Sequence, residues 1–130
     1  MATSRTLSDR DYQHLLTFRT ELRRFLRWSE ERAQAEGLTA AQHQLLLAVR
    51  GSADPQGATI GEVADALLLR HHTATELVDR AESSDLLRRE RDGDDHRVVR
   101  LRITRAGAGK LARLSRQHLD ELARLRAGIL

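Results

Sequence analysis

The sequence contains no cysteine, a single proline and few aromatic residues, and each shortage narrows what the protein can do. Without cysteine it can form no disulfide and no thiolate nucleophile, and it can bind zinc only through histidine and carboxylates. No apolar run approaches the roughly 20 residues that cross a bilayer. The first residues, MATSRTLSDRD, lack the apolar core of a signal peptide. We therefore expect a cytoplasmic protein with no membrane partner.

Familiar catalytic motifs are missing as well. There is no G-x-S-x-G, no glycine-rich phosphate loop and no H-E-x-x-H, so we expect neither an enzyme nor a bound cofactor. The formal net charge is +3, but the basic excess lies in residues 105–130, whereas residues 59–104 are slightly acidic. Net charge alone therefore does not indicate a nucleic-acid partner.

Residues 8–36 are predicted to form one long amphipathic helix, with Ser8 as its N-cap and Gly37 at its end. At about 1.5 Å per residue the helix is roughly 40 Å long, which exceeds the diameter of a compact small domain. Part of its apolar stripe must therefore be covered by another chain, which favours a homodimer. The stripe consists of Tyr12, Leu15, Phe18, Leu22, Phe25 and Leu26.

Three shorter helices are predicted to follow. Thr39 opens the first, in which Leu45, Leu46, Leu47 and Val49 are expected to be largely buried, and a turn at residues 51–58 ends it. The next two are amphipathic, because their apolar residues follow a helical spacing on either side of a break near residues 69–71. These apolar residues are Ile60, Val63, Ala64, Leu67 and Leu68, then Ala74, Leu77, Val78 and Ala81.

The period then changes from helical to alternating. Residues 97–103, RVVRLRI, alternate as a strand does, and residues 86–91, LLRRER, are a plausible partner across the turn DGDD at residues 92–95. Thr104 is predicted to cap a last helix that carries another apolar stripe. This stripe consists of Leu111, Leu114, His118, Leu122, Leu125 and Ile129.

Two short helices and a hairpin between two long helices indicate a mainly α fold with a small β-hairpin. We expect residues 1–130 to form a single domain. Its winged helix-turn-helix region would span residues 38–104, inside a helical dimerisation frame made of residues 8–36 and 105–130. The recognition helix would occupy about residues 71–84 and the wing about residues 86–103.

The chain resembles the MarR (multiple antibiotic resistance regulator) family in an ordered set of motifs. These are LTAAQHQLLLAV, TIGEVADALLLRHHTATELVDRAE and DGDDHRVVRLRIT, followed by the early helical Gly107, over roughly residues 38–110. The resemblance implies a homodimeric, sequence-specific regulator, usually a repressor, that binds a pseudo-palindromic operator in double-stranded DNA. It further implies release by a small phenolic or other aromatic ligand.

Three positions depart from the family pattern. Arg70 stands where the family usually has a Ser or Thr N-cap on the recognition helix, so a capping contact should be lost. Asp85 replaces the glycine that commonly ends that helix, and aspartate tolerates a left-handed conformation better than most residues. In the wing, the usual D-R-R reads Asp95-His96-Arg97.

The inward apolar positions of the recognition helix turn its polar residues outward. In the resembled family the second helix reads the major groove with its N-terminal half. We therefore predict DNA contacts from one set of residues, in which Glu76 can instead pair with the residue one turn on. The set consists of His71, His72, Thr73, Thr75, Glu76 and Arg80.

The wing supplies the remaining DNA candidates. Arg97 can enter a narrow minor groove, where the negative potential is enhanced, and Asp95 is predicted to shape the wing or orient Arg97. The other strand arginines are candidates for phosphate contacts, with a solvated strand face as the alternative. They are Arg88, Arg89 and Arg91, with Arg100 and Arg102 on the second strand.

Trp28 points away from the main stripe of the first helix, so it can serve a dimer interface or line a ligand crevice beside Phe25 and His43. A metal site built from His14, His43 and His118 is conceivable, but we favour core or interface histidines and expect no metal. The competing function is a helical adaptor whose winged helix binds protein rather than DNA.

Overall fold

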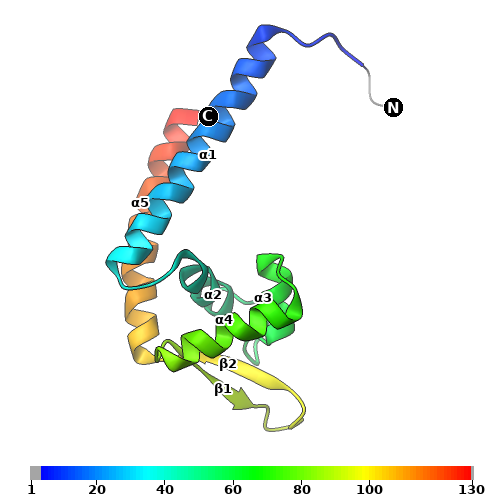
Figure 1. Cartoon of the computed structure of the whole chain (residues 1–130), viewed down its shortest axis with the longest axis vertical. Coiled ribbons are helices and arrows are strands. Elements are labelled where there is room, and N and C mark those ends of the chain that lie inside the picture. Colours follow the sequence, from blue (N-terminus) through cyan, green and yellow to red (C-terminus); the bar gives the residue numbers. More distant parts are fainter. Residues whose placement is uncertain (1–3, 130) are drawn as a thin grey trace.

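The computed structural model describes residues 4–129, with side chains through residue 126. Two long helices, α1 and α5, run side by side and carry at one end a bundle of shorter helices and a hairpin (Figure 1). The predicted fold class, mainly α with a small β-hairpin, is confirmed. The elements are α1 (Asp9–Ala35), α2 (Ala40–Arg50), α3 (Ile60–Leu67), α4 (His71–Ser83), β1 (Leu87–Arg91), β2 (Val99–Ile103) and α5 (Arg105–Ile129).

The predicted helix starts are set by local side-chain caps. The Ser8 hydroxyl accepts from the Asp11 amide at 3.3 Å, while the Asp11 carboxylate accepts from the Ser8 amide at 2.9 Å. Thr39 and Gln42 form the same reciprocal pair at the start of α2. These contacts satisfy amide groups that lack partners in the first turn of a helix, so both starts are confirmed.

The largest fully buried side chains of the core come from α2, α3, α4, both strands and α5. Two predictions about the core were wrong. Leu47 is 52% exposed, because Leu45, Leu46 and Val49 occupy the inward face of α2. Leu68 is 92% exposed, because α3 ends at Leu67 and Leu68 is its C-cap in the left-handed conformation, with φ 56°. These largest fully buried side chains are Leu45, Leu46, Leu87, Leu101, Leu114, Val63 and Val78.

The two strands pair antiparallel, with Leu87 opposite Ile103 and Arg91 opposite Val99. Both strands are shorter than predicted, because β1 begins at Leu87 rather than at residue 86 and β2 begins at Val99 rather than at residue 97. The segment before α3 adds a further rung, since the Leu101 amide donates to the Ala58 carbonyl at 2.8 Å. The hairpin is therefore fastened to the start of α3.

Contacts at the junction between the hairpin and α5 explain why the sequence has Thr104 and Gly107 there. The Thr104 hydroxyl donates to the Asp85 carbonyl at 2.6 Å and accepts from the Gly107 amide at 3.1 Å, which confirms Thr104 as a cap. A side chain at Gly107 would collide with the Leu86 carbonyl oxygen. Asp85 itself has φ 58°, as expected for a residue in place of glycine.

The frame helices leave much apolar surface uncovered. Along α1 only Ala33 is buried, and the N-terminal end of this helix projects beyond α5 (Figure 1). Within the described part of the chain, no helix has the length and apolarity needed to cross a membrane. The exposed apolar side chains of the frame are Tyr12, Leu15, Leu16, Phe18, Leu22, Leu26, Leu119 and Leu122.

Candidate nucleic-acid interface

Helix α4 lies on the surface, with one face in the core and the other exposed. Ala74, Val78 and Ala81 are buried against the core. No residue of the predicted DNA-contact set is buried, because the set lies away from that face. His71, His72, Glu76 and Arg80 are exposed, and Thr73 and Thr75 are half-buried.

The first turn of α4 lacks a side-chain cap. Arg70 is the N-cap residue and makes no side-chain capping bond, which confirms the predicted loss. The Thr75 hydroxyl donates to the His71 carbonyl at 3.0 Å, so its lone pairs remain available as acceptors. Within residues 4–126 no ion pair joins Glu76 to Arg80. Both charges therefore stay available to a partner.

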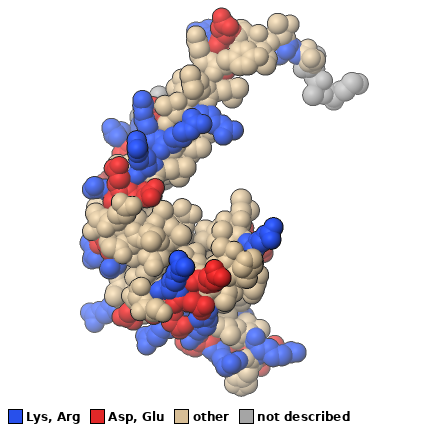
Figure 2. Space-filling view, viewed as in Figure 1, with Lys and Arg blue, Asp and Glu red and all other residues tan. Residues whose placement is uncertain are grey.

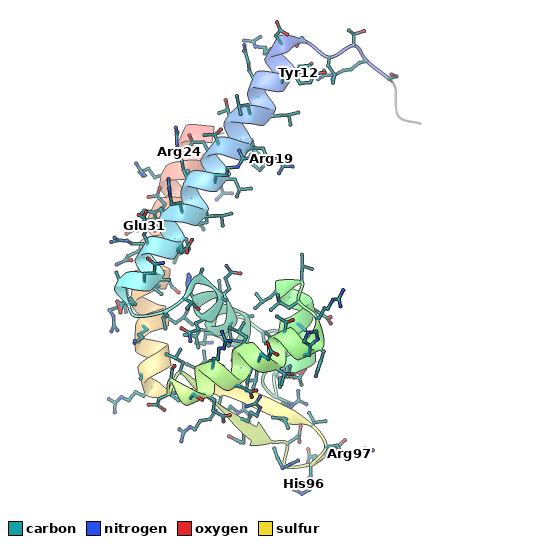
Figure 3. The ribbon with its side chains drawn as sticks, in the orientation of Figure 1. Tyr12, Arg19, Arg24, Glu31, His96 and Arg97 are labelled. Carbon is teal, nitrogen blue, oxygen red and sulfur yellow. The ribbon has the colours of Figure 1, made fainter. Side chains whose placement is uncertain are left out.

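The wing carries Arg97 at its tip beside His96 (Figure 3). The Arg97 side chain is 91% exposed. The Asp95 carboxylate accepts from the Arg97 amide at 3.0 Å, from Nε at 3.1 Å and from Nη2 at 3.2 Å. These hydrogen bonds from Arg97 lower the pKa of Asp95, so the carboxylate stays charged and holds the guanidinium at the tip.

The strand arginines have different surroundings. Arg88 is exposed, and the Arg91 guanidinium donates to the His96 carbonyl at 2.7 Å. Arg89 is bound within the protein, because its Nη1 lies 2.6 Å from the Glu82 carboxylate and its Nη2 lies 2.6 Å from that of Asp79. Sequence reasoning missed this bracing of α4 by β1, since no local pattern links residues on different elements.

A hollow of about 360 Å³ separates the wing from the start of α4. His71 from α4 and Arg97 from the wing both line it, beside Thr59, Ile60 and Gly61 at the start of α3. The structure therefore brings together the two predicted DNA-contacting elements. Acidic and basic side chains alternate across the visible face of this lobe rather than forming one basic surface (Figure 2).

Two aromatic residues of the frame, Phe25 and Trp28, meet the ring of His118. Its ring centroid lies 4.8 Å from that of Trp28, 5.9 Å from that of Phe25 and 4.7 Å from that of His43. Its Nδ1 lies 2.7 Å from the Leu114 carbonyl oxygen, which can only accept, so Nδ1 carries a proton. Burial, and secondarily the charge of His118, lowers the pKa of His43.

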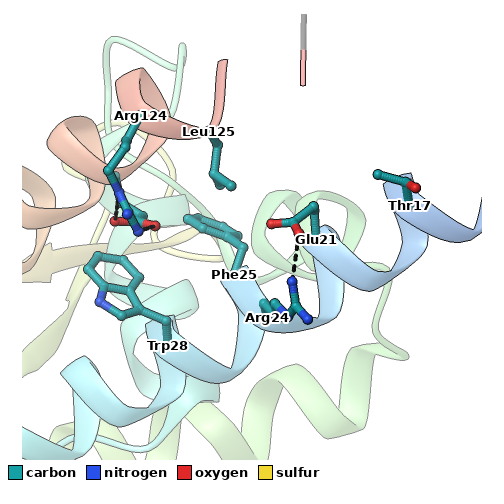
Figure 4. Close-up of a pocket in the computed structure, with 8 residues that line it drawn as sticks. Thr17, Glu21, Arg24, Phe25, Trp28, Arg124 and Leu125 are labelled. Carbon is teal, nitrogen blue, oxygen red and sulfur yellow. Dashed lines mark hydrogen bonds and ion pairs between the residues drawn. The ribbon is translucent and has the colours of Figure 1, made fainter. Parts of the chain in front are cut away.

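A surface hollow of about 460 Å³ opens beside this cluster, between α1 and α5 (Figure 4). Phe25 and Trp28 line it, but His43 does not. Two ion pairs flank it, Arg24 with Glu21 at 2.8 Å and Arg124 with Glu121 at 2.7 Å. His43 and His118 do meet, but no group of three metal-binding side chains forms among the residues described.

A helix-turn-helix followed by a hairpin wing defines the class of winged helix-turn-helix folds. Residues 36–98 match the sequence model of the MarR family. No curated protein sequence matches the chain. The match over residues 36–98, together with the shared fold, supports a MarR family regulator.

Solved structures of that family share the fold. AbsC, a MarR family transcriptional regulator from Streptomyces coelicolor, has a TM-score of 0.77 at 21% identity, over 98% of this chain and 85% of its own. A MarR family protein from Bacillus stearothermophilus has a TM-score of 0.76 at 25% identity, over 92% and 82%. The S. aureus MepR–DNA complex has a TM-score of 0.73 at 20% identity, over 88% and 82%.

Proposed function

We propose that the protein is a homodimeric, sequence-specific DNA-binding transcription regulator, most simply a repressor that a small aromatic ligand releases. The observation that carries the proposal is the hollow between α4 and the wing, which both His71 and Arg97 line. A reading helix and a wing arginine on one surface can engage neighbouring grooves of one duplex. The function we propose is binding rather than catalysis.

The exposed face of α4 is suited to the major groove. Histidine and threonine side chains at its start, His71, His72 and Thr73, can hydrogen-bond to base edges or phosphates, and Glu76 can accept from a cytosine amino group. The uncapped first turn adds free backbone amides beside them. Arg97, held by Asp95, would enter the adjacent minor groove.

The uncovered apolar side chains of α1 and α5 support the proposal that the protein is a homodimer. Tyr12 is 57% exposed, Leu15 59% and Leu119 67%. Contiguous exposed apolar surface of this kind marks an interaction site in soluble proteins. A second copy would cover it and place two α4 helices about one helical turn of DNA apart, which matches a pseudo-palindromic operator.

The hollow beside Phe25 and Trp28 supports the proposal that the protein binds a ligand. An aromatic molecule could stack on these rings between the two frame helices. Because α1 and α5 also carry the winged lobe, filling this hollow would change the separation of the two α4 helices in a dimer. That change is the route by which we propose DNA is released.

Selection from random duplexes with the purified protein tests this function. We expect an enriched palindrome whose affinity falls steeply as salt rises, because phosphate contacts release counterions. A folded dimer that enriches no sequence at low salt would overturn the proposal in favour of a protein-binding adaptor.

A further inference from the structure

Arg100, on β2, binds three separate segments of the chain. Its Nη1 donates to the Asp54 carboxylate at 2.7 Å and to the Gly57 carbonyl at 3.1 Å, both in the loop between α2 and α3. Its Nε and Nη2 donate to one oxygen of Asp92, at the base of the wing turn, at 3.2 Å and 3.1 Å. Glu62 of α3 lies 3.8 Å from Nη1.

These groups form a compact charged cluster. Only 15% of the Arg100 side chain is exposed, with 14% of Asp92 and 23% of Asp54. Burial opposes the charge of Arg100, but its hydrogen bond to Asp92 and the charge of Asp54 outweigh it and raise its pKa. With its guanidinium held by carboxylates on both sides, Arg100 is not free to bind phosphate.

The contacts continue from Arg100 to the tip of the wing. Asp92 holds Arg100 with one carboxylate oxygen and accepts with the other from the amides of Asp94, at 2.8 Å, and Asp95, at 3.4 Å. Asp95 in turn holds Arg97. An unbroken series of hydrogen bonds therefore joins the loop before α3 to the side chain at the wing tip.

We propose that Arg100 is a positioning residue, which fastens the wing to the α2–α3 loop and to α3 and so sets where Arg97 stands relative to α4. The proposal rests on the DNA-binding function proposed above. It has an unusual consequence, because it requires an acidic residue outside the wing, Asp54, to support binding of a polyanion.

The sharpest test is whether replacing Asp54 weakens or tightens DNA binding. Asp54→Ala and the control Asp94→Ala remove the same charge, but the exposed Asp94 side chain makes no hydrogen bond or ion pair within residues 4–126. Loss of a carboxylate alone should tighten DNA binding in both variants. We expect Asp54→Ala to weaken binding to the selected duplex about tenfold and Asp94→Ala not to weaken it. Equal tightening in both would overturn the proposal.

The salt dependence separates positioning from phosphate contact. We expect Arg100→Ala to weaken binding about tenfold with an unchanged slope of log affinity against log salt, whereas Arg97→Ala lowers that slope by about one. Arg100→Lys, which keeps the charge but not the planar fork, should restore affinity only in part. A slope lowered equally by Arg100→Ala would make it a phosphate contact and overturn the proposal.

Hydrogen exchange tests the fastening without DNA. In free Arg100→Ala protein we expect the Asp94 and Asp95 amides to exchange about tenfold faster, with the amides of Leu45 and Leu46 in α2 unchanged. Unchanged wing amides, or equal acceleration in α2, would overturn the proposal. If the wild-type protein binds no DNA, the proposed function fails, while this experiment still decides whether Arg100 fastens the wing.

Discussion

The apolar surface of α1 leads to a quantitative prediction for dimerisation. Leu26, on α1, is 52% exposed. Full burial of a leucine side chain is worth about 2–3 kcal/mol, so covering the exposed half contributes about 1.2 kcal/mol. A two-fold interface contains the residue twice. Leu26→Ala should therefore weaken the dimer by about 2.4 kcal/mol, which is roughly fiftyfold in the dissociation constant.

Leu47 provides a matched control for this prediction. It is also 52% exposed, but it lies on α2, outside the frame. Sedimentation equilibrium over a dilution series should show a raised dissociation constant for Leu26→Ala and the wild-type value for Leu47→Ala. Equal constants for the two variants, or a wild-type protein that is monomeric at micromolar concentration, would refute the assignment of this surface to a homodimer.

Three further predictions concern stability. Gly107→Ala should lower the free energy of unfolding in urea by about 1–3 kcal/mol, because the added methyl meets the Leu86 carbonyl, whereas Gly93→Ala, with nothing near its added methyl, should cost less. Leu68→Asn should raise the free energy of unfolding by about 0.5–1 kcal/mol, because Leu68 is exposed and left-handed and asparagine tolerates that conformation. No increase would contradict backbone strain at Leu68. Because the pKa of His43 is lowered in the folded state, the unfolded chain binds the proton first, so stability should fall as pH drops below about 6.5. The fall should be smaller in His43→Gln, and an identical pH profile would contradict this origin.

Much of the fold could be predicted because its signals are local. The helix starts at residues 8, 39 and 104 depend on side chains three residues from the amides or hydroxyls they bind. The change from helical to alternating period located the hairpin. The error at Leu68 arose because an apolar pattern continued past the structural end of its helix. Leu68 fits the helical spacing of α3, but the helix stops one residue earlier.

In the candidate interface, too, the features with local signals could be predicted and the long-range contacts could not. Periodicity was enough to place the outward face of α4, and the D-x-R motif was enough to single out Arg97. The partners of the other arginines could not be predicted, because Arg100 and Asp54 are separated by 46 positions and Arg89 binds two acids on another element. Whether an arginine on a strand faces phosphate or carboxylate is decided only by how the segments pack.

The contact between His43 and His118 was equally hidden. The sequence places them on separate helices, and only the packing of α2 against α5 brings their rings together beside Trp28. A sequence-based metal hypothesis grouped these two with His14, which is exposed on α1. Two of the three histidines do meet, through their rings.

The measurement that tests the central claim most directly is a salt titration of binding to the selected duplex. The wild-type protein is compared with Arg97→Ala and with Arg116→Ala, which removes the same charge from an exposed position on α5. We expect a steep fall in wild-type affinity with salt, a slope lower by about one for Arg97→Ala, and the wild-type slope for Arg116→Ala. Equal slopes for wild type and Arg97→Ala would contradict contact between the wing and DNA.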